Sequence, residues 1–379
     1  MRILHLCNKV PFPGRDGSSI AMEALIRLEA ALGHEVHVIA LNTEKHWVEV
    51  PEAPFAHVKL EAIPVRTAPH WTTALRNLGS RQSYYASRFW DPTVAQRIAK
   101  CASRADLVVI DSLFMAVYLE VLGSAPRILR AHNVEHAIWL RGLREEPLLR
   151  RAYVALQAAR LARWEREVAR HVDRIWTISE EDRAWFTQHS TCPTSTIPCS
   201  ADAAHGPWAF SGAASPLAYH LGALDWTPNV RGMQWFLDEV VPHLRHTQVD
   251  VFSRQWPFAP AQLPVRYRSG ACTEFENYGL FLAPIRSGSG MRIKLLEAMM
   301  RGKAIVTTSL GAEGLKAEHG THLFLADSAA DFAAALDLLA TDEARRTAIG
   351  RAAADHARAH FADDVVAQRV AQDLATFTP

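Results

Sequence analysis

The sequence lacks the cysteine patterns that hold metals or cross-link secreted domains. Its five cysteines, Cys7, Cys101, Cys192, Cys199 and Cys272, are scattered, odd in number and show no CxxC spacing. Zinc sites and disulfide frameworks need closely spaced or paired cysteines. We therefore expect reduced thiols, no metal site and a cytoplasmic protein.

A membrane-spanning segment is also lacking. The longest apolar run, Leu107 to Leu122, is interrupted by Asp111 and Glu120, and it predicts a buried strand followed by the start of a helix. The first residues, MRILHLCNKV, have neither the long apolar region nor the cleavage site of a signal peptide.

Strong net charge and several cofactor motifs are missing as well. The net charge is +1, so no global charge favours nucleic acid and any electrostatic function must be local. No GxGxxG follows the first apolar strand, no Walker A sequence is present and no Asp-x-Asp is placed to hold a metal. These absences argue against dinucleotide chemistry and against a resident cofactor.

What the sequence does contain is a repeated alternation of strand-like and helical segments. With 379 residues and 49% apolar composition, the chain is long enough for two domains with separate cores. Strands separated by helices indicate parallel sheets with crossovers. We expect strands over Ile3–Cys7, Glu35–Leu41, Ala105–Ile110, Arg127–Ala131, Arg174–Ile178, Ala218–Leu224, Gln248–Phe252, Gly279–Ala283 and Ala304–Thr308.

Helical periodicity and one change of composition complete the predicted organisation. We expect helices over Ile20–Gly33, Leu143–Val172, Asn229–Leu244, Ile293–Gly302 and Ala329–Thr341, and a linker in the Pro/Ser/Thr/Gly-rich stretch Cys192–Pro216. The predicted fold is α/β, with two Rossmann-like doubly wound domains that face each other across a cleft. We place the domains at residues 1–198 and 199–358, followed by a C-terminal helix at 359–379.

The most informative stretch is Gly279–Leu315. A strand ends at Pro284 and a Ser/Gly loop opens a helix, so backbone amides and the helix N-terminus together predict an anion site. Arg292 lies in the first turn beside it. The candidate loop residues are Ser287, Gly288, Ser289, Gly290 and Met291.

The helix that follows has two faces. At 100° per residue, Leu295, Leu296, Met299 and Met300 form one apolar sector, while Lys294, Glu297 and Arg301 lie on the opposite side. This polar side is either a binding face or a solvated face with i,i+3 and i,i+4 pairs worth about 0.2–0.5 kcal/mol each.

The same segment resembles the donor site of retaining glycosyltransferases of family 4, which have the GT-B fold. The similarity lies in Glu297-Ala298-Met299 and in GKAIVTT at 302–308. The resemblance implies that Glu297 binds the ribose hydroxyls of a nucleotide. The family has a second Glu eight residues earlier, where this sequence has Ser289.

Resemblance extends to Gly222–Leu244, which is similar to the first strand, loop and helix of the family's C-terminal domain. Asn229 and Arg231 in this stretch are therefore donor-binding candidates. The Arg and Lys that clamp the diphosphate in the family are not recognisable there. Arg292 and Lys294, with Arg231 as a third candidate, are expected to supply that charge and to stabilise the leaving diphosphate.

In the N-terminal half, the loop after the first strand resembles the family's glycine loop, which lies under the donor phosphates. Gly14, Gly17 and Ser18 are the candidates, and an ordinary βα turn is the alternative. His132 follows the strand Arg127–Ala131 and corresponds to the family's histidine that contacts the donor sugar. A purely structural histidine is the alternative there.

Residues 65–105 form a basic and aromatic segment. Seven Lys/Arg residues stand against one Asp, with Trp71, Tyr84, Tyr85, Phe89 and Trp90 among them. This composition suits an anionic membrane surface or a lipid-linked acceptor. The alternative is an ordinary surface segment whose aromatic side chains pack into the core.

The expected function is transfer of a sugar, with retention of configuration, from a nucleotide-diphosphate sugar to a hydroxyl of a glycan or lipid-linked acceptor. UDP is the first expectation for the nucleotide and GDP the second. The pathway is then cell-surface polysaccharide or glycoconjugate synthesis, at the inner face of the membrane. The alternatives are a nucleotide-sugar epimerase of similar fold and a non-catalytic partner that binds nucleotide sugar.

Overall fold

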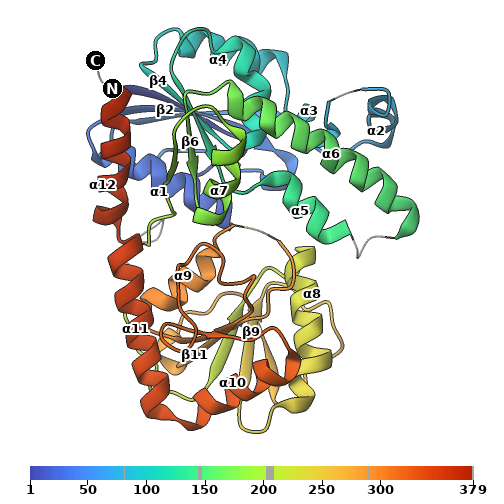
Figure 1. Ribbon diagram of the computed structural model, residues 1–379, viewed down its shortest axis with the longest axis vertical. Coiled ribbons are helices and arrows are strands. Elements are labelled where there is room, and N and C mark those ends of the chain that lie inside the picture. Colours follow the sequence, from blue (N-terminus) through green and yellow to red (C-terminus); the bar gives the residue numbers. More distant parts are fainter. Residues whose placement is uncertain (81, 144–146, 202–208, 289, 378–379) are drawn as a thin grey trace. The chain divides into compact units, whose positions relative to one another are not determined.

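The computed structural model describes residues 1–80, 82–143, 147–201, 209–288 and 290–377. The chain divides into two compact units. Unit 1 comprises Met1–Ala204 and Asp363–Pro379, and unit 2 comprises His205–Ala362. Each unit has a parallel sheet covered by helices, and Figure 1 labels the elements. This confirms the predicted α/β class with two Rossmann-like domains.

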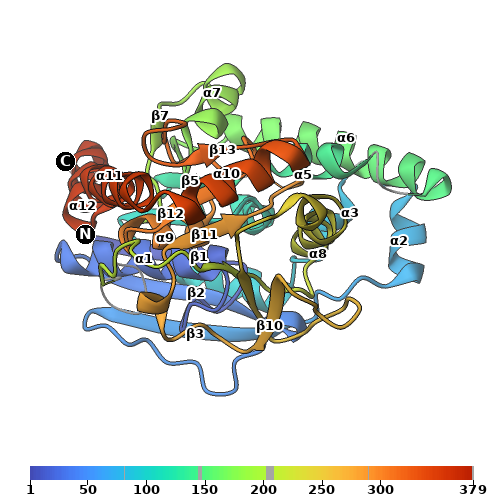
Figure 2. The ribbon, with the colours of Figure 1, turned by 90° about the horizontal axis from the view of Figure 1, so that it is seen from below.

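Unit 1 is built on a seven-stranded parallel sheet in the order β3-β2-β1-β4-β5-β6-β7. Figure 2 shows β1, β2 and β3 side by side at one end of this sheet. The strands are β1 Arg2–Cys7, β2 Glu35–Thr43, β3 Val58–Val65, β4 Leu107–Asp111, β5 Arg127–Ala131, β6 Arg174–Thr177 and β7 Thr194–Thr196.

The helices of unit 1 follow the crossovers between these strands. Apolar side chains of the buried central strands, such as Leu6, Ile110 and Leu129, form its largest core cluster. The α-helices are α1 Gly17–Ala31, α2 Trp71–Asn77, α3 Tyr84–Ser87, α4 Pro92–Ala102, α5 Glu135–Gly142, α6 Leu148–Arg170, α7 Glu180–His189 and α12 Asp363–Leu374.

The last of these, α12, returns to unit 1 from the other end of the chain and lies beside α1 (Figure 1). Arg27 of α1 forms an ion pair with Asp363, and Arg174 of β6 donates to Asp373 at 2.6 Å. Val366, Val370 and Leu374 pack into an apolar cluster with strand residues of the sheet. The C-terminal helix is therefore part of the unit 1 core.

Unit 2 repeats the same architecture with six parallel strands in the order β10-β9-β8-β11-β12-β13. The strands are β8 Ala218–Leu221, β9 Val249–Ser253, β10 Val265–Ser269, β11 Leu280–Ala283, β12 Ala304–Thr307 and β13 Phe324–Leu325. The α-helices are α8 Thr227–Trp235, α9 Ile293–Met300, α10 Ala329–Thr341 and α11 Glu343–Phe361.

Several sequence expectations need correction. The strands β3, β10 and β13 were not expected, and β7 occupies the start of the stretch interpreted as a linker. The long helix expected over Leu143–Val172 begins at Leu148 and follows a separate α5. The helix expected over Asn229–Leu244 begins at Thr227 and passes through a wider π turn and a 3₁₀ turn after Trp235. Among the described residues, no helix is both long and apolar enough to cross a membrane.

Candidate active site

In both sheets, the strand order reverses at a central pair of neighbouring strands. This pair is β1 and β4 in unit 1 and β8 and β11 in unit 2. In open parallel sheets, ligands bind outside the carboxyl ends of the strands at such a switch point. Most sequence-predicted site residues that the structure describes lie in loops or first helical turns at these ends.

In unit 2, the loop after β11 leads into a helix with an uncapped N-terminus. Gly288 and Gly290 have φ angles of 107° and 79°, a left-handed conformation that favours glycine. The residue at the N-cap of α9 is Arg292, and within the described residues its side chain makes no cap hydrogen bond to the first turn of the helix. Since helix N-termini attract anions, this end of α9 is suited to a phosphate.

Two buried polar atoms at this switch point have no hydrogen-bond partner among the described residues. They are Oγ of Ser287 and Nε2 of His220. His220 lies in β8 and donates from Nδ1 to the carbonyl oxygen of Leu282 at 2.9 Å, which leaves Nε2 as an acceptor. A buried polar atom without a partner is costly, so both atoms indicate a ligand or water. The predicted Ser289 lies outside the described residues.

Lys294 and Asn229 meet at the same place from two different helices. Nζ of Lys294 lies 3.5 Å from Oδ1 of Asn229. Helix α8 also packs closely on the loop after β11, because a Cβ on Gly232 of α8 would lie 2.0 Å from the carbonyl oxygen of Pro284. Burial, followed by the charge of Arg292, lowers the pKa of Lys294 to about 7.

Arg292, Arg231 and Met291 are all half-buried. Nη1 of Arg292 donates to the carbonyl oxygen of Gly290 at 2.8 Å, so the guanidinium lies against the glycine loop. Arg231 lies in α8, two residues beyond Asn229. Arg292 thus lies against Gly290, and Lys294 lies close to Asn229 of α8. Donor binding by these residues stays a prediction.

Glu297 lies one turn further along α9 and pairs with Arg301. Nε and Nη2 of Arg301 donate to Oε1 of Glu297 at 3.0 and 2.8 Å, and the guanidinium stacks on Phe275 at 3.7 Å. The two side chains are 21% and 15% exposed, so this face of α9 is largely covered rather than solvated. A ribose contact of Glu297 stays a prediction.

In unit 1, unlike at α9, the first helix has a side-chain cap at its N-terminus. Asp16 caps α1, because its carboxylate accepts from the amides of Ser18 and Ser19 at 3.1 and 3.0 Å. Burial opposes ionisation, but Lys9 and the amide of Ser19 hold the pKa of Asp16 below its usual range.

The glycine loop before α1 is packed against that helix. A Cβ on Gly14 would lie 2.9 Å from Oε2 of Glu23, which already accepts from the amide of Gly14. Gly17 is the first residue of α1. Gly14 thus has a structural reason to be glycine, and phosphate contact by Gly14, Gly17 and Ser18 stays a prediction.

His132 belongs to a buried network at the carboxyl ends of the central strands. Its Nε2 lies 2.5 Å from Oδ1 of Asp111, the last residue of β4. The other oxygen of Asp111 lies 2.7 Å from Nε2 of His5 and 3.1 Å from Nη1 of Arg130. His5 continues the chain of contacts from its Nδ1 to Glu29 of α1 at 3.0 Å.

Charge and burial fix the protonation of this network. Burial opposes the charge on Asp111, but Arg130 and His132 hold its pKa well below the usual range. Burial alone would lower the pKa of His5, but Glu29 raises it well above the usual value. Burial lowers the pKa of His132 despite Asp111. His132 is therefore neutral at pH 7 and donates from Nε2 to Asp111.

One subset of this network has the spacing of a metal site. Ligand atoms of His5, Cys7 and Asp111 lie within 4.8 Å of one another, and all three residues are buried. However, both ring nitrogens of His5 already contact carboxylates, and the guanidinium of Arg130 contacts Asp111. We interpret the cluster as a hydrogen-bonded ion network.

Glu135 is the first residue of α5 and follows His132 by three residues in the sequence. Burial, followed by the charge of Glu165, raises the pKa of Glu135 to about 8. The side chain thus keeps its proton at neutral pH, which makes it a hydrogen-bond donor beside the turn that carries His132.

The sequence reasoning did not single out Asp111, His5, Glu29 or His220. A signal was present in the strands, because His5, Asp111 and His220 each interrupt or end an otherwise apolar run. Buried polar residues in central strands need partners, so His5 in β1, Asp111 in β4 and Arg130 in β5 could have predicted a network.

Comparison with known families identifies the chain. Residues 16–198 match the model described as glycosyl transferase 4-like domain, and residues 266–342 match the model described as glycosyl transferases group 1. Together these matches cover more than two thirds of the chain. Among curated protein sequences, no relative matches.

Solved structures have the same fold at low sequence identity. Sucrose-phosphate synthase from Thermosynechococcus elongatus has a TM-score of 0.70 at 13% identity, over 99% of each chain. HepE of Anabaena in complex with UDP has a TM-score of 0.66 at 14% identity, over 99% of this chain and 100% of that one. The pneumococcal O-GlcNAc transferase GtfA, in complex with UDP and GlcNAc, has a TM-score of 0.63 at 11% identity, over 99% of each chain. The chain belongs to the family 4 glycosyltransferases with the GT-B fold.

Proposed function

We propose that this glycosyltransferase takes its sugar from a nucleotide-diphosphate sugar whose diphosphate binds at the N-terminus of α9. The observation that carries the proposal is the uncapped helix end between Gly290 and Lys294, with Oγ of Ser287 buried beside it. UDP is the first candidate nucleotide and GDP the second. HepE and GtfA, which share the fold, were crystallised with UDP.

The roles of the surrounding residues follow from their chemistry. Arg292 and Lys294 are cations beside the helix N-terminus, so they stabilise negative charge as the diphosphate leaves. Glu297 accepts hydrogen bonds from the ribose hydroxyls, and Asn229 and Arg231 line the same donor site. His132 contacts the donor sugar, and Asp111 holds its ring in one tautomer.

The proposed stereochemical course is retention. The acceptor hydroxyl attacks the anomeric carbon on the face from which the diphosphate departs, and a phosphate oxygen accepts the hydroxyl proton. No carboxylate nucleophile, divalent metal or cofactor has a part in this course. The proposed acceptor is a hydroxyl of a glycan or lipid-linked sugar in cell-surface polysaccharide or glycoconjugate synthesis.

Two experiments test this proposal. Thermal-shift titrations with UDP, GDP, ADP and dTDP identify the base, because a ligand at a hundredfold over its Kd stabilises by about 2.7 kcal/mol. Radiolabelled donor is then incubated with and without a glycan acceptor. Label in the acceptor supports transfer, a changed free sugar without acceptor indicates an epimerase, and binding without turnover indicates a non-catalytic partner.

We further propose peripheral contact with the cytoplasmic face of an anionic membrane through α2. Trp71 and Leu75 on this helix are 71% and 56% exposed, and Arg76 lies between Leu75 and the half-exposed Leu78. Apolar side chains flanked by cations suit a lipid interface. α2 lies at the periphery of unit 1 (Figure 2).

Not all of the basic and aromatic segment takes part in this surface. Arg88 is largely buried, donates to the carbonyl oxygen of Thr67 and lies over the rings of Tyr84, Tyr85 and Phe89. The test is sedimentation with anionic vesicles. Trp71→Ser with Arg76→Glu should abolish binding, and Trp47→Ser, which alters an exposed tryptophan elsewhere, should not. Equal binding by both variants contradicts the α2 contact.

A further inference from the structure

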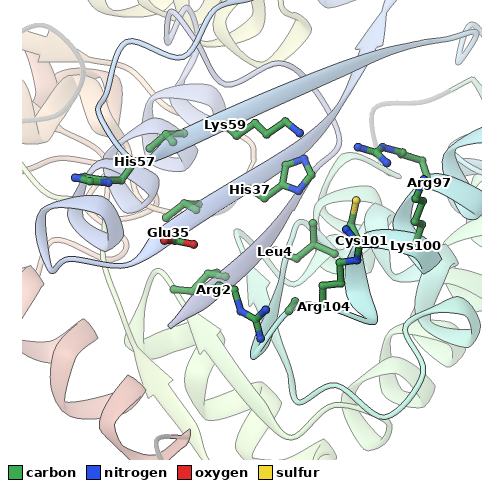
Figure 3. Close-up of a pocket in the computed structure, with 14 residues that line it drawn as sticks. Arg2, Leu4, Glu35, His37, His57, Lys59, Arg97, Lys100, Cys101 and Arg104 are labelled. Carbon is green, nitrogen blue, oxygen red and sulfur yellow. The ribbon is translucent and has the colours of Figure 1, made fainter.

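A cavity lies in unit 1 at the amino ends of the strands, whereas His132 follows the carboxyl end of β5. It has a volume of about 570 Å³ and is formed where β1, β2 and β3 begin, beside the second half of α4. Figure 3 shows the side chains that line it. This volume lies in the range of small-molecule sites, about 300–1,000 Å³.

The lining is dominated by cations from three different elements. Arg2 comes from β1 and Lys59 from β3, and α4 with its C-terminal turn contributes Arg97, Lys100 and Arg104. The spacing of three residues puts Arg97 and Lys100 on one face of α4, and Arg104 follows in the turn after the helix. Glu35 is the carboxylate that lines the cavity with them.

Part of this charge is neutralised by carboxylates at the rim. Arg2 pairs with Asp106 at 2.8 Å. Lys59 and Arg97 share the single carboxylate of Glu61, at 3.1 and 2.5 Å. Five cations thus face three carboxylates, counting Glu35, which leaves two positive charges.

Lys100 and Arg104 carry that excess. Neither side chain has an ion pair with a carboxylate of the described residues. Their position near the C-terminus of α4 is favourable for cations, but the helix end does not explain why Arg2 and Lys59 face the same space. Like charges gathered from separate elements repel one another unless an anion joins them.

We propose that this cavity binds a phosphate monoester dianion, held between Lys100 and Arg104 of the α4 segment and Arg2 and Lys59 of the strand edge. Two charges on the ligand match the excess of two on the cavity, and guanidinium groups bind phosphate oxygens in pairs. The rest of the volume holds the group that the phosphate esterifies. Because the ligand bridges α4 to the strand edge, its binding stabilises unit 1.

The proposal does not depend on the donor site of unit 2. The chemistry fits a free phosphorylated metabolite or the headgroup of a phospholipid, so the test has one arm for each. Glycerol 3-phosphate and inorganic phosphate are titrated at low ionic strength by calorimetry and by thermal shift. In the second arm, vesicles of phosphatidylcholine with and without phosphatidic acid are sedimented with the full chain.

Lys100→Gln with Arg104→Gln removes the excess charge, and Arg163→Glu alters an exposed cation of α6 outside the cavity. The double variant should bind the soluble phosphates, or the phosphatidic acid vesicles, at least about tenfold more weakly than the wild type, while Arg163→Glu binds normally. Its melting temperature without ligand and its affinity for UDP should be unchanged, which excludes misfolding. Absence of binding by the wild type, or equal binding by the double variant, overturns the proposal.

Discussion

The two units have the same strand order at the centre of their sheets, but their switch points differ in how far the polar groups are already paired. In unit 1, His5 and His132 both contact the carboxylate of Asp111, and Asp16 caps α1. In unit 2, α9 has no side-chain cap, and Ser287 keeps a buried hydroxyl without a partner among the described residues.

This difference indicates a division of labour. Most polar atoms of the unit 1 network already have partners, although Oε1 of Glu29 and Nε of Arg130 have none among the described residues. The network has less to gain from an anion, and it holds His132 in one orientation. A helix N-terminus with free amides and neighbouring cations gains most from a diphosphate. Under the proposed function, unit 2 would bind the donor phosphates, and unit 1 would present a fixed histidine. Four predictions test this difference between the two units.

The largest effect is expected from Asp111→Asn. The variant leaves the charge of Arg130 buried without its carboxylate and leaves His5 with Glu29 alone, which should cost about 3–5 kcal/mol of unfolding free energy. Urea denaturation of the full chain, followed by tryptophan fluorescence, measures the loss. Asp106→Asn, at an exposed pair with Arg2, is the matched control and should change little. A loss as small as that of the control would show that the network does not hold unit 1 together.

A similar effect, on activity rather than stability, is expected from Arg292→Ala. Removal of a cation at the leaving diphosphate should lower kcat by about 100-fold and raise the donor KM, with the melting temperature unchanged. Arg351→Ala removes an exposed arginine of α11 in the same unit and should leave the kinetics intact. Unaltered kinetics of Arg292→Ala contradict the assignment of the donor site.

A smaller effect concerns Lys294 and pH. The free enzyme loses the proton of Lys294 around pH 7, because burial lowers its pKa to about 7. A bound diphosphate raises that pKa, so binding takes up a proton above pH 7. The Kd of UDP should therefore rise with pH, by up to about tenfold per unit, and level off below pH 7. Lys294→Arg keeps its charge and should show a flat profile between about pH 7 and 9.

The smallest effect is expected at the cap of α1. Asp16→Ala should cost about 1 kcal/mol of stability and leave the affinity for UDP unchanged. Asp91→Ala is a matched control, because Asp91 caps α4 in the same way. If Asp16→Ala alone changes the UDP affinity, the loop with Gly14, Gly17 and Ser18 binds the donor phosphates, and the comparison between the units fails.

Much of the fold could be predicted because its signals are local. The strand Arg127–Ala131 and the helix Ala329–Thr341 have the bounds that the sequence pattern predicts. The edge strands β3 and β10 were missed because they carry charged residues and are only half-buried, so they lack a continuous apolar run. Their pairing with β2 and β9 comes from the sheet as a whole.

The candidate site could likewise be predicted only where its residues are close together in the sequence. The loop Ser287–Met291 with Arg292 and Lys294 lies within eight residues of chain, so a motif could reveal it. The buried network joins residues 5, 29, 111, 130 and 132 from four elements, and only the strand order brings them together. The cap at Asp16 could have been predicted, because Asp before the start of a helix is a common N-cap. It was not among the residues expected from the sequence.

The most direct test of the division between the units is a crystal structure of the full chain with UDP. The account predicts the diphosphate at the N-terminus of α9, hydrogen-bonded to backbone amides of its first turn and to Oγ of Ser287, with Arg292 and Lys294 beside it. Diphosphate density at the N-terminus of α1, with Asp16 displaced and the α9 end empty, would contradict it.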